Sequence, residues 1–151
     1  MVKRILILLM TTFLLSSVAL AENGLVSVRS NHSVAETADR LESILNDKGM
    51  KVVARIDHSA GAASVDLKLR PTELLIFGNP KVGTPLMQCE QTVAIDLPQK
   101  MLIWEDESGA VWLAYNDPGY LAERHDIRGC EGNLKKIGEA LAGFARAAAA
   151  R

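Results

Sequence analysis

The spacing of apolar residues changes twice between residues 25 and 57. Leu25–Arg29 alternates apolar with small or polar residues, which predicts a short strand. Apolar residues then recur at helical spacing and predict one buried helix face: Val34, Ala38, Leu41, Ile44 and Leu45. Ser33 has the position of an N-cap with Glu36 completing a capping box, and Gly49 stands where a glycine ends a helix. Residues 52–57 alternate again, which predicts a half-buried strand.

The middle of the chain combines an apolar run with proline-containing breaks. Leu74–Phe77 is apolar on both faces, as a central strand is, and Gly78-Asn79-Pro80 breaks the run. Thr84-Pro85 is typical of an N-cap followed by a first-turn proline. We therefore expect a short helix that starts there and passes through Cys89.

The last third of the sequence predicts a hairpin and two further helices. Residues 101–104 and 111–115 flank a glycine-containing turn, as paired strands do. Asp117-Pro118 repeats the cap-and-proline pattern and opens a short helix towards His125, and a terminal helix from Leu134 fades into an alanine run. Because consecutive strands lack regular crossover helices, the order predicts an α+β fold, a mainly antiparallel sheet with helices packed on one face.

The first 21 residues have the organisation of a signal peptide. Lys3 and Arg4 precede the apolar stretch 5–18, and Ala19-Leu20-Ala21 offers small residues for cleavage before Glu22. The apolar stretch is shorter than the about 20 residues that a spanning helix needs. We therefore expect a cleaved signal, a periplasmic or secreted protein, and no stable membrane insertion after cleavage.

Composition and charge exclude several classes of protein. The 151 residues are 48% hydrophobic and 23% charged with a net charge of −1, unlike a disordered chain. Only one stretch is apolar enough to meet a bilayer, which excludes a polytopic membrane protein. A sequence pI near 6.3 does not provide the basic face that nucleic-acid binding needs, so we expect no nucleic-acid partner. Removing residues 1–21 leaves 130 residues with a net charge of −3, which is enough chain for a core without a metal.

Five sequence motifs occur in a fixed order between Gly24 and about Ile127: Arg55–His58, Leu74–Lys81, Gly83–Met87, Ala94–Pro98 and Tyr115–Pro118. Together they resemble the family called domain of unknown function 302. The resemblance implies a small two-layer fold like that of TATA-binding protein, and a homodimer. It implies no activity, so catalytic residues and cofactors stay unknown. We divide the chain into a signal peptide (1–21), the family domain (22–128) and an additional C-terminal helix (129–151).

Two histidines and one turn are candidates for ligand binding. His58 ends its predicted strand on the same face as Val52, Ala54 and Ile56, where an imidazole is either a packed core group or a ligand. The turn Asn79–Thr84 precedes a predicted helix start and carries Lys81, so it could hold a carboxylate or phosphate, although its spacing departs from a phosphate loop. His125 lies near a helix C-terminus. The candidate ligand-binding residues are His58, Asn79, Lys81, Thr84 and His125.

The two cysteines, Cys89 and Cys130, both remain after the expected cleavage. In an oxidising compartment, two cysteines with no other partner most simply form a disulfide. Cys89 and the segment 129–151 both depart from the family pattern, and their joint occurrence favours this bond. A rival interpretation uses Met87, both cysteines and a histidine as ligands for copper(I), but the spacing does not support it, and no metal site is predicted.

The sequence contains no recognised catalytic signature. We expect an exported, noncatalytic domain of unknown biochemical activity that dimerises and binds a small molecule or an envelope protein. The alternative is an uncharacterised enzyme or metal-binding protein with a site around His58, the Asn79–Thr84 turn and His125. That alternative requires the three segments to meet at one partly open pocket.

Overall fold

The strands of the protein form one antiparallel sheet. The computed structural model describes residues 19–20 and 23–151, so most of the predicted signal peptide lies outside the described residues. In the described part the sheet has six strands in the order β1-β2-β6-β5-β4-β3. Their bounds are β1 Ala19–Leu20, β2 Leu25–Arg29, β3 Lys51–Asp57, β4 Thr72–Gly78, β5 Gln99–Glu105 and β6 Val111–Asn116.

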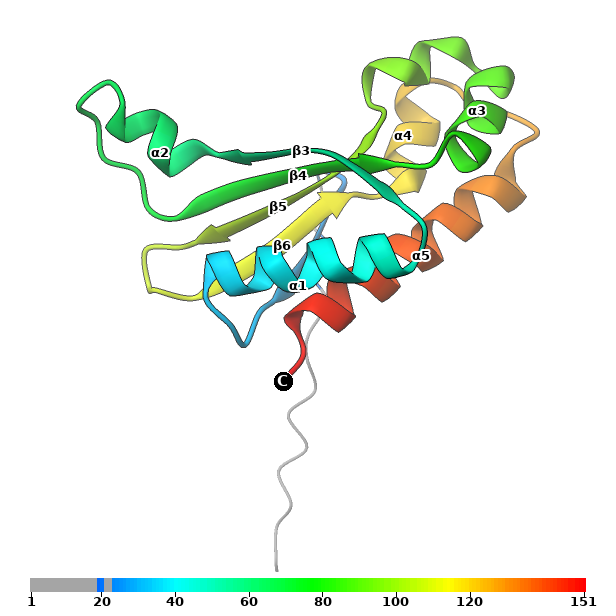
Figure 1. Cartoon of the computed structure of the whole chain (residues 1–151). Coiled ribbons are helices and arrows are strands. Elements are labelled where there is room, and N and C mark those ends of the chain that lie inside the picture. The colour runs from blue at the N-terminus through cyan, green and yellow to red at the C-terminus, as the bar shows by residue number, and fades with distance from the viewer. Residues whose placement is uncertain (1–18, 21–22) are drawn as a thin grey trace, which may run out of the picture.

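Two long helices cover one face of the sheet and lie against each other, as Figure 1 shows. They are α1 (Val34–Asp47) and α5 (Glu131–Ala149). The shorter helices lie towards the ends of the sheet: α2 (His58–Ala63), α3 (Pro80–Cys89), the 3-10 helix η1 (Gln91–Ile95) and α4 (Pro118–Arg124). This arrangement is the α+β fold with helices on one sheet face that the sequence predicted.

The core lies between the two long helices and the sheet. Alternate strand residues point into it, so Leu75 and Phe77 of β4 and Met101 and Ile103 of β5 are fully buried. The helices contribute residues at helical spacing: Val34, Ala38, Leu41 and Leu45 from α1, and Ile137, Leu141 and Phe144 from α5.

The predicted N-cap and end of α1 are confirmed. The Ser33 hydroxyl accepts from the Glu36 amide at 3.2 Å, and Gly49 follows the helix in the left-handed conformation with φ +69°. The start predicted for the next helix is wrong, because α3 begins at Pro80 and not after Thr84. Asn79 is the N-cap, and Pro85 lies inside the helix.

A β-bulge changes the predicted faces of β3. Val52 pairs with Phe77, whereas Ala54 pairs with Ile76, and the register shifts between them. Val52 and Ala54 therefore lie on opposite faces, so the prediction that they share one face is wrong. Beyond the bulge, Arg55 faces the helices and pairs with Glu73 and with carboxylates of α1.

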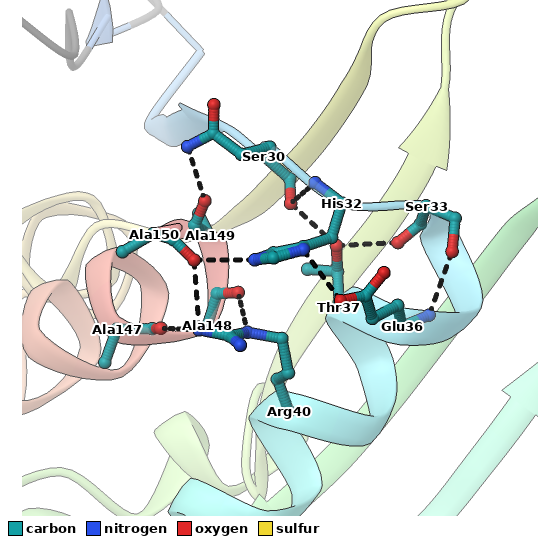
Figure 2. A network of polar contacts seen from close by, with 11 residues as sticks. Ser30, His32, Ser33, Glu36, Thr37, Arg40, Ala147, Ala148, Ala149 and Ala150 are labelled. Carbon is teal, nitrogen blue, oxygen red and sulfur yellow. Dashed lines mark hydrogen bonds and ion pairs between the residues drawn. The ribbon is translucent and has the colours of Figure 1, made fainter.

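The alanine run at the end of α5 is part of the core, and the helix does not fade as predicted. Ala145 and Ala148 are fully buried. Figure 2 shows how α1 and the preceding loop hold the helix C-terminus. Arg40 donates to the carbonyl oxygens of Ala147, Ala148 and Ala150 at 3.3, 3.0 and 3.0 Å. These contacts satisfy carbonyls that a helix end leaves without partners, and we call them the C-terminal clamp.

Candidate functional site

An apolar pocket of about 630 Å³ opens between α3, residues 133–144 of α5 and the ends of three strands. Its size falls within the roughly 300–1,000 Å³ typical of small-molecule sites. Most of its wall is hydrophobic, and the large apolar side chains that line it are Phe77, Met87, Leu97, Ile137, Leu141 and Phe144. A wall of this kind favours a ligand with a substantial apolar body.

One buried polar side chain interrupts the apolar wall. Gln99 is the first residue of β5, lines the pocket, and is only 9% exposed. It lies directly opposite Phe77 in the β4–β5 ladder, on the face that carries the helices. Its side-chain nitrogen Nε2 is buried and has no hydrogen-bond partner among the described residues. Leaving such a donor unpaired costs about 1–3 kcal/mol, so a ligand acceptor placed there would recover a hydrogen bond.

Three of the candidate residues from the sequence, Asn79, Lys81 and Thr84, line this pocket. Asn79 is the N-cap of α3, and Lys81 and Thr84 lie in its first turns and not in a turn that precedes the helix. Asn79 fixes the position of the helix: its Oδ1 accepts from the Lys81 amide at 2.9 Å, and its Nδ2 donates to the Gly49 carbonyl at 3.1 Å. The amides of residues 82 and 83 donate to the Asn79 carbonyl, so the first amides of α3 are already used within the chain.

His58 lies at the far end of β3 from the pocket. In the β3–β4 ladder Lys51 pairs with Gly78, beside α3, whereas Asp57 pairs with Glu73 at the other end. Six residues of strand separate the two ends by about 20 Å. His58 is exposed, begins α2, and is not among the residues that line the pocket.

His125 belongs to a separate polar cluster. Its ring is mostly buried, with Nε2 at 2.6 Å from Asp96 Oδ2 and Nδ1 at 3.0 Å from Thr92 Oγ1. The order carboxylate, imidazole and hydroxyl resembles a nucleophilic triad. However, the Thr92 hydroxyl donates its only proton to Glu90 Oε1 at 2.8 Å. Backbone and hydroxyl hydrogen bonds from Thr92 lower the pKa of Glu90, which keeps this acceptor ionised.

The His125 cluster therefore joins α4 to η1 and leaves no proton for the imidazole to take from the hydroxyl. The structure thus brings Asn79, Lys81 and Thr84 together but places His58 and His125 elsewhere. The single pocket formed by all three segments, which the enzyme alternative requires, is not present in the described part of the chain.

Cys89 and Cys130 are joined by a disulfide, which ties the end of α3 to the start of α5. These two helices form opposite parts of the pocket wall, so the bond holds the wall together. The disulfide also uses both thiols that the copper interpretation needs as ligands. Among residues 19–20 and 23–151 no group of three or more His, Cys, Asp or Glu side chains is placed to hold a metal ion.

Sequence reasoning missed Gln99 and the two lysines, Lys51 and Lys136, that complete the pocket lining. The sequence gives one weak indication of Gln99: the alternation of the strand that continues with Met101 and Ile103 puts this polar residue at an inward-facing position. The lysines carry no such signal, because they lie on β3 and α5 and meet only in the folded chain.

Comparison with known proteins identifies the family. A family model described as "Domain of unknown function DUF302" matches residues 26–146. The chain therefore belongs to the DUF302 family, as its motifs suggested, and the match extends into α5. A crystal structure of an uncharacterized conserved DUF302 protein from Bacillus stearothermophilus superposes with a TM-score of 0.74. That structure is 20% identical, and the match covers 81% of this chain and 95% of the other, which supports the shared fold.

Curated relatives come from Brucella and are longer proteins. The chain is 52% identical over 109 residues to proteins named fluoride-specific ion channel FluC 1 in Brucella suis and Brucella abortus. The match covers 72% of this chain but only 43% and 40% of those proteins, so the chain spans less than half of their length. Among the described helices of the present chain, none has the length and apolar character that a membrane span requires.

Proposed function

We propose that this DUF302 domain binds a small molecule with a mainly apolar body in the pocket between α3 and α5. The observation that carries the proposal is Gln99, a residue that lines the pocket and whose buried Nε2 has no hydrogen-bond partner among the described residues. Native cores pair such groups in the great majority of cases. A ligand with a hydroxyl, ether or carbonyl oxygen would accept from Gln99 while its apolar part covers Phe77 and Leu141.

The proposal is tested with 1,10-decanediol, a neutral probe that has an apolar chain and hydroxyl oxygens. Its binding is followed by chemical-shift changes in two-dimensional NMR spectra of the protein. Ala140 lines the pocket and is exposed, so Ala140→Phe fills the space without disturbing the core. Ala147→Phe is the matched control, since Ala147 is exposed on the same helix but does not line the pocket.

We expect the diol to bind the wild-type protein and Ala147→Phe, and to bind Ala140→Phe at least tenfold more weakly. Absence of binding to the wild type, or equal binding to Ala140→Phe, would contradict the proposal. Native mass spectrometry of protein purified without added ligand complements the titration, because a natural ligand held by the pocket adds its mass.

We further propose that the protein is exported and acts as a homodimer. The predicted signal peptide supports export, as does a disulfide, a bond that persists in oxidising compartments. The sheet face opposite α1 and α5 carries partly exposed apolar side chains on neighbouring strands, among them Ile56, Leu74, Leu102 and Trp104. A second copy could cover this face by presenting the same residues across a two-fold axis.

The mass of the native protein in solution tests the dimer. Ile56 is 38% exposed at the edge strand, so Ile56→Glu leaves the core intact and places a charge on the proposed contact. We expect a dimer for the wild type and a monomer for this variant. A monomeric wild type, or an Ile56→Glu dimer of unchanged stability, would contradict a dimer through this face.

A second candidate function, an accessory role in fluoride handling, rests on the 52% identity over 109 residues with the Brucella proteins named as fluoride channels. Deletion of the gene would then lower growth in fluoride but not in equal chloride, and the wild-type gene would restore it. Equal growth of the deletion strain and its parent in fluoride would contradict this role.

A further inference from the structure

Three lysines surround the pocket, and they come from three different elements. Lys51 begins β3, Lys81 lies in the first turn of α3, and Lys136 lies on α5. All three line the pocket and are exposed, so these charged residues lie where the pocket opens to solvent. None of them forms an ion pair with any residue that the structure describes.

No carboxylate side chain is among the residues that line the pocket. The charge at the mouth is therefore uniformly positive, although the protein as a whole is slightly acidic. Charges of one sign around an apolar cavity focus the potential into it, attract an ion of opposite sign and repel one of the same sign. The first amides of α3 are used by Asn79, so the lysine side chains supply this attraction.

Resting on the proposed binding function, we propose that the ligand is an amphipathic anion. Its charged group, a carboxylate or a chemically similar anion, lies at the mouth beside Lys81 and Lys136. Its apolar chain or ring fills the hydrophobic interior, and a hydroxyl or carbonyl oxygen further along accepts from Gln99 Nε2. The pocket thus selects by charge at its mouth and by one hydrogen bond in its interior.

Three probes of equal chain length separate these features: 10-hydroxydecanoate, decanoate and 1,10-decanediol. Hydroxydecanoate carries both the anion and the hydroxyl, decanoate only the anion, and the diol only hydroxyls. In wild-type protein at low salt we expect hydroxydecanoate to bind about tenfold more tightly than either other probe, which corresponds to about 1.4 kcal/mol. Added salt should reduce the affinity difference between hydroxydecanoate and the diol, because salt screens the exposed lysine charges.

Amino-acid substitutions then test which residues cause the preference for an anionic group and which cause the preference for a hydroxyl group. Replacement of both Lys81 and Lys136 by Gln should abolish the preference for hydroxydecanoate over the diol. Lys135→Gln is the matched control, because Lys135 neighbours Lys136 but pairs with Glu139 and does not line the pocket. Gln99→Leu should abolish the preference for hydroxydecanoate over decanoate and leave the charge preference in place.

The outcomes distinguish the two proposals. If the wild type binds the diol as tightly as hydroxydecanoate, or if the double lysine variant keeps its charge preference, the anionic ligand class is wrong while the pocket remains a binding site. If the wild type binds none of the three probes, the proposed binding function is wrong, and the proposed anionic ligand class is then wrong as well.

Discussion

Two regions that contact helix α5, the C-terminal clamp and the pocket, differ in how completely their polar groups are paired. At the C-terminal clamp, Arg40 donates to the last carbonyl oxygens of α5 (Figure 2). Neighbouring carbonyls accept from His32 Nε2 at 2.6 Å and from the Asn31 side chain. Beside them, the Ser30 and Thr37 hydroxyls form a hydrogen bond of 2.7 Å. In the pocket, by contrast, the Gln99 amide nitrogen has no partner among the described residues.

This difference separates stability from function. A fully paired network lowers the free energy of the folded chain and leaves no polar group for a ligand to pair with. An unpaired donor in an apolar pocket wall costs stability, and a ligand that pairs with it recovers that cost. Variants at the clamp should therefore lower the free energy of unfolding with little effect on binding. Variants at the pocket should change binding, and removal of the unpaired donor there should raise the free energy of unfolding.

The largest expected effect comes from removing the disulfide, which joins the two halves of the pocket wall. The cysteines are separated by 41 residues, and in the chain-entropy model closing a loop of this length stabilises the fold by about 4 kcal/mol. Replacing both Cys89 and Cys130 by Ser should lower the free energy of unfolding by that order and also weaken binding of the diol, because α3 is released from α5. Urea unfolding and the NMR titration measure the two effects. Unchanged stability would mean that the bond does not support the fold.

Arg40→Ala should have the next largest effect and should be confined to stability. The substitution removes donors from three carbonyl groups at the end of α5. We expect a loss of about 2–3 kcal/mol in urea unfolding and an unchanged affinity for the diol. Arg128→Ala is the control, since Arg128 is highly exposed and pairs only with nearby Asp126. A tenfold loss of affinity in folded Arg40→Ala would show that the two ends of α5 are coupled.

The smallest effect concerns Asp106, a paired group far from the pocket. Hydrogen bonds from Ser108 and from the Trp112 ring nitrogen, the latter at 2.7 Å, lower its pKa from 3.8 to about 2. Because the folded-state pKa is depressed, its contribution is fully present above about pH 4 and is lost as the pH falls through about 2. Asp106→Asn should therefore be slightly less stable than wild type at pH 6, and the difference should shrink below about pH 4 and vanish only below about pH 2. A constant difference across thermal unfolding at these pH values would contradict the assignment.

Local signals allowed most of the fold to be predicted from the sequence. Ser33 and Gly49 bound α1 through interactions within a few residues, and the alternation in β2 needs no distant partner. The start of α3 failed because two cap-and-proline pairs compete there. Asn79 is favoured over Thr84 because its side chain also donates to the Gly49 carbonyl, a contact that exists only after folding.

The candidate site was predictable only where its residues are adjacent in sequence. Asn79, Lys81 and Thr84 share one segment, so a single motif pointed to all three. His58 was assigned to a strand face, but it follows the bulge at Val53 and begins a helix instead. Gln99 could not be recognised as unpaired, since pairing depends on what the folded chain places around it.

Gln99→Leu tests the central claim most directly when unfolding free energy and diol affinity are measured on the same protein. Met101→Leu is the control, as Met101 is the next inward residue of β5, is fully buried, and does not line the pocket. We predict that Gln99→Leu raises the unfolding free energy by about 1 kcal/mol, because a buried unpaired donor is removed, and weakens diol binding about tenfold. A variant that is less stable than wild type and binds the diol with unchanged affinity would contradict the account.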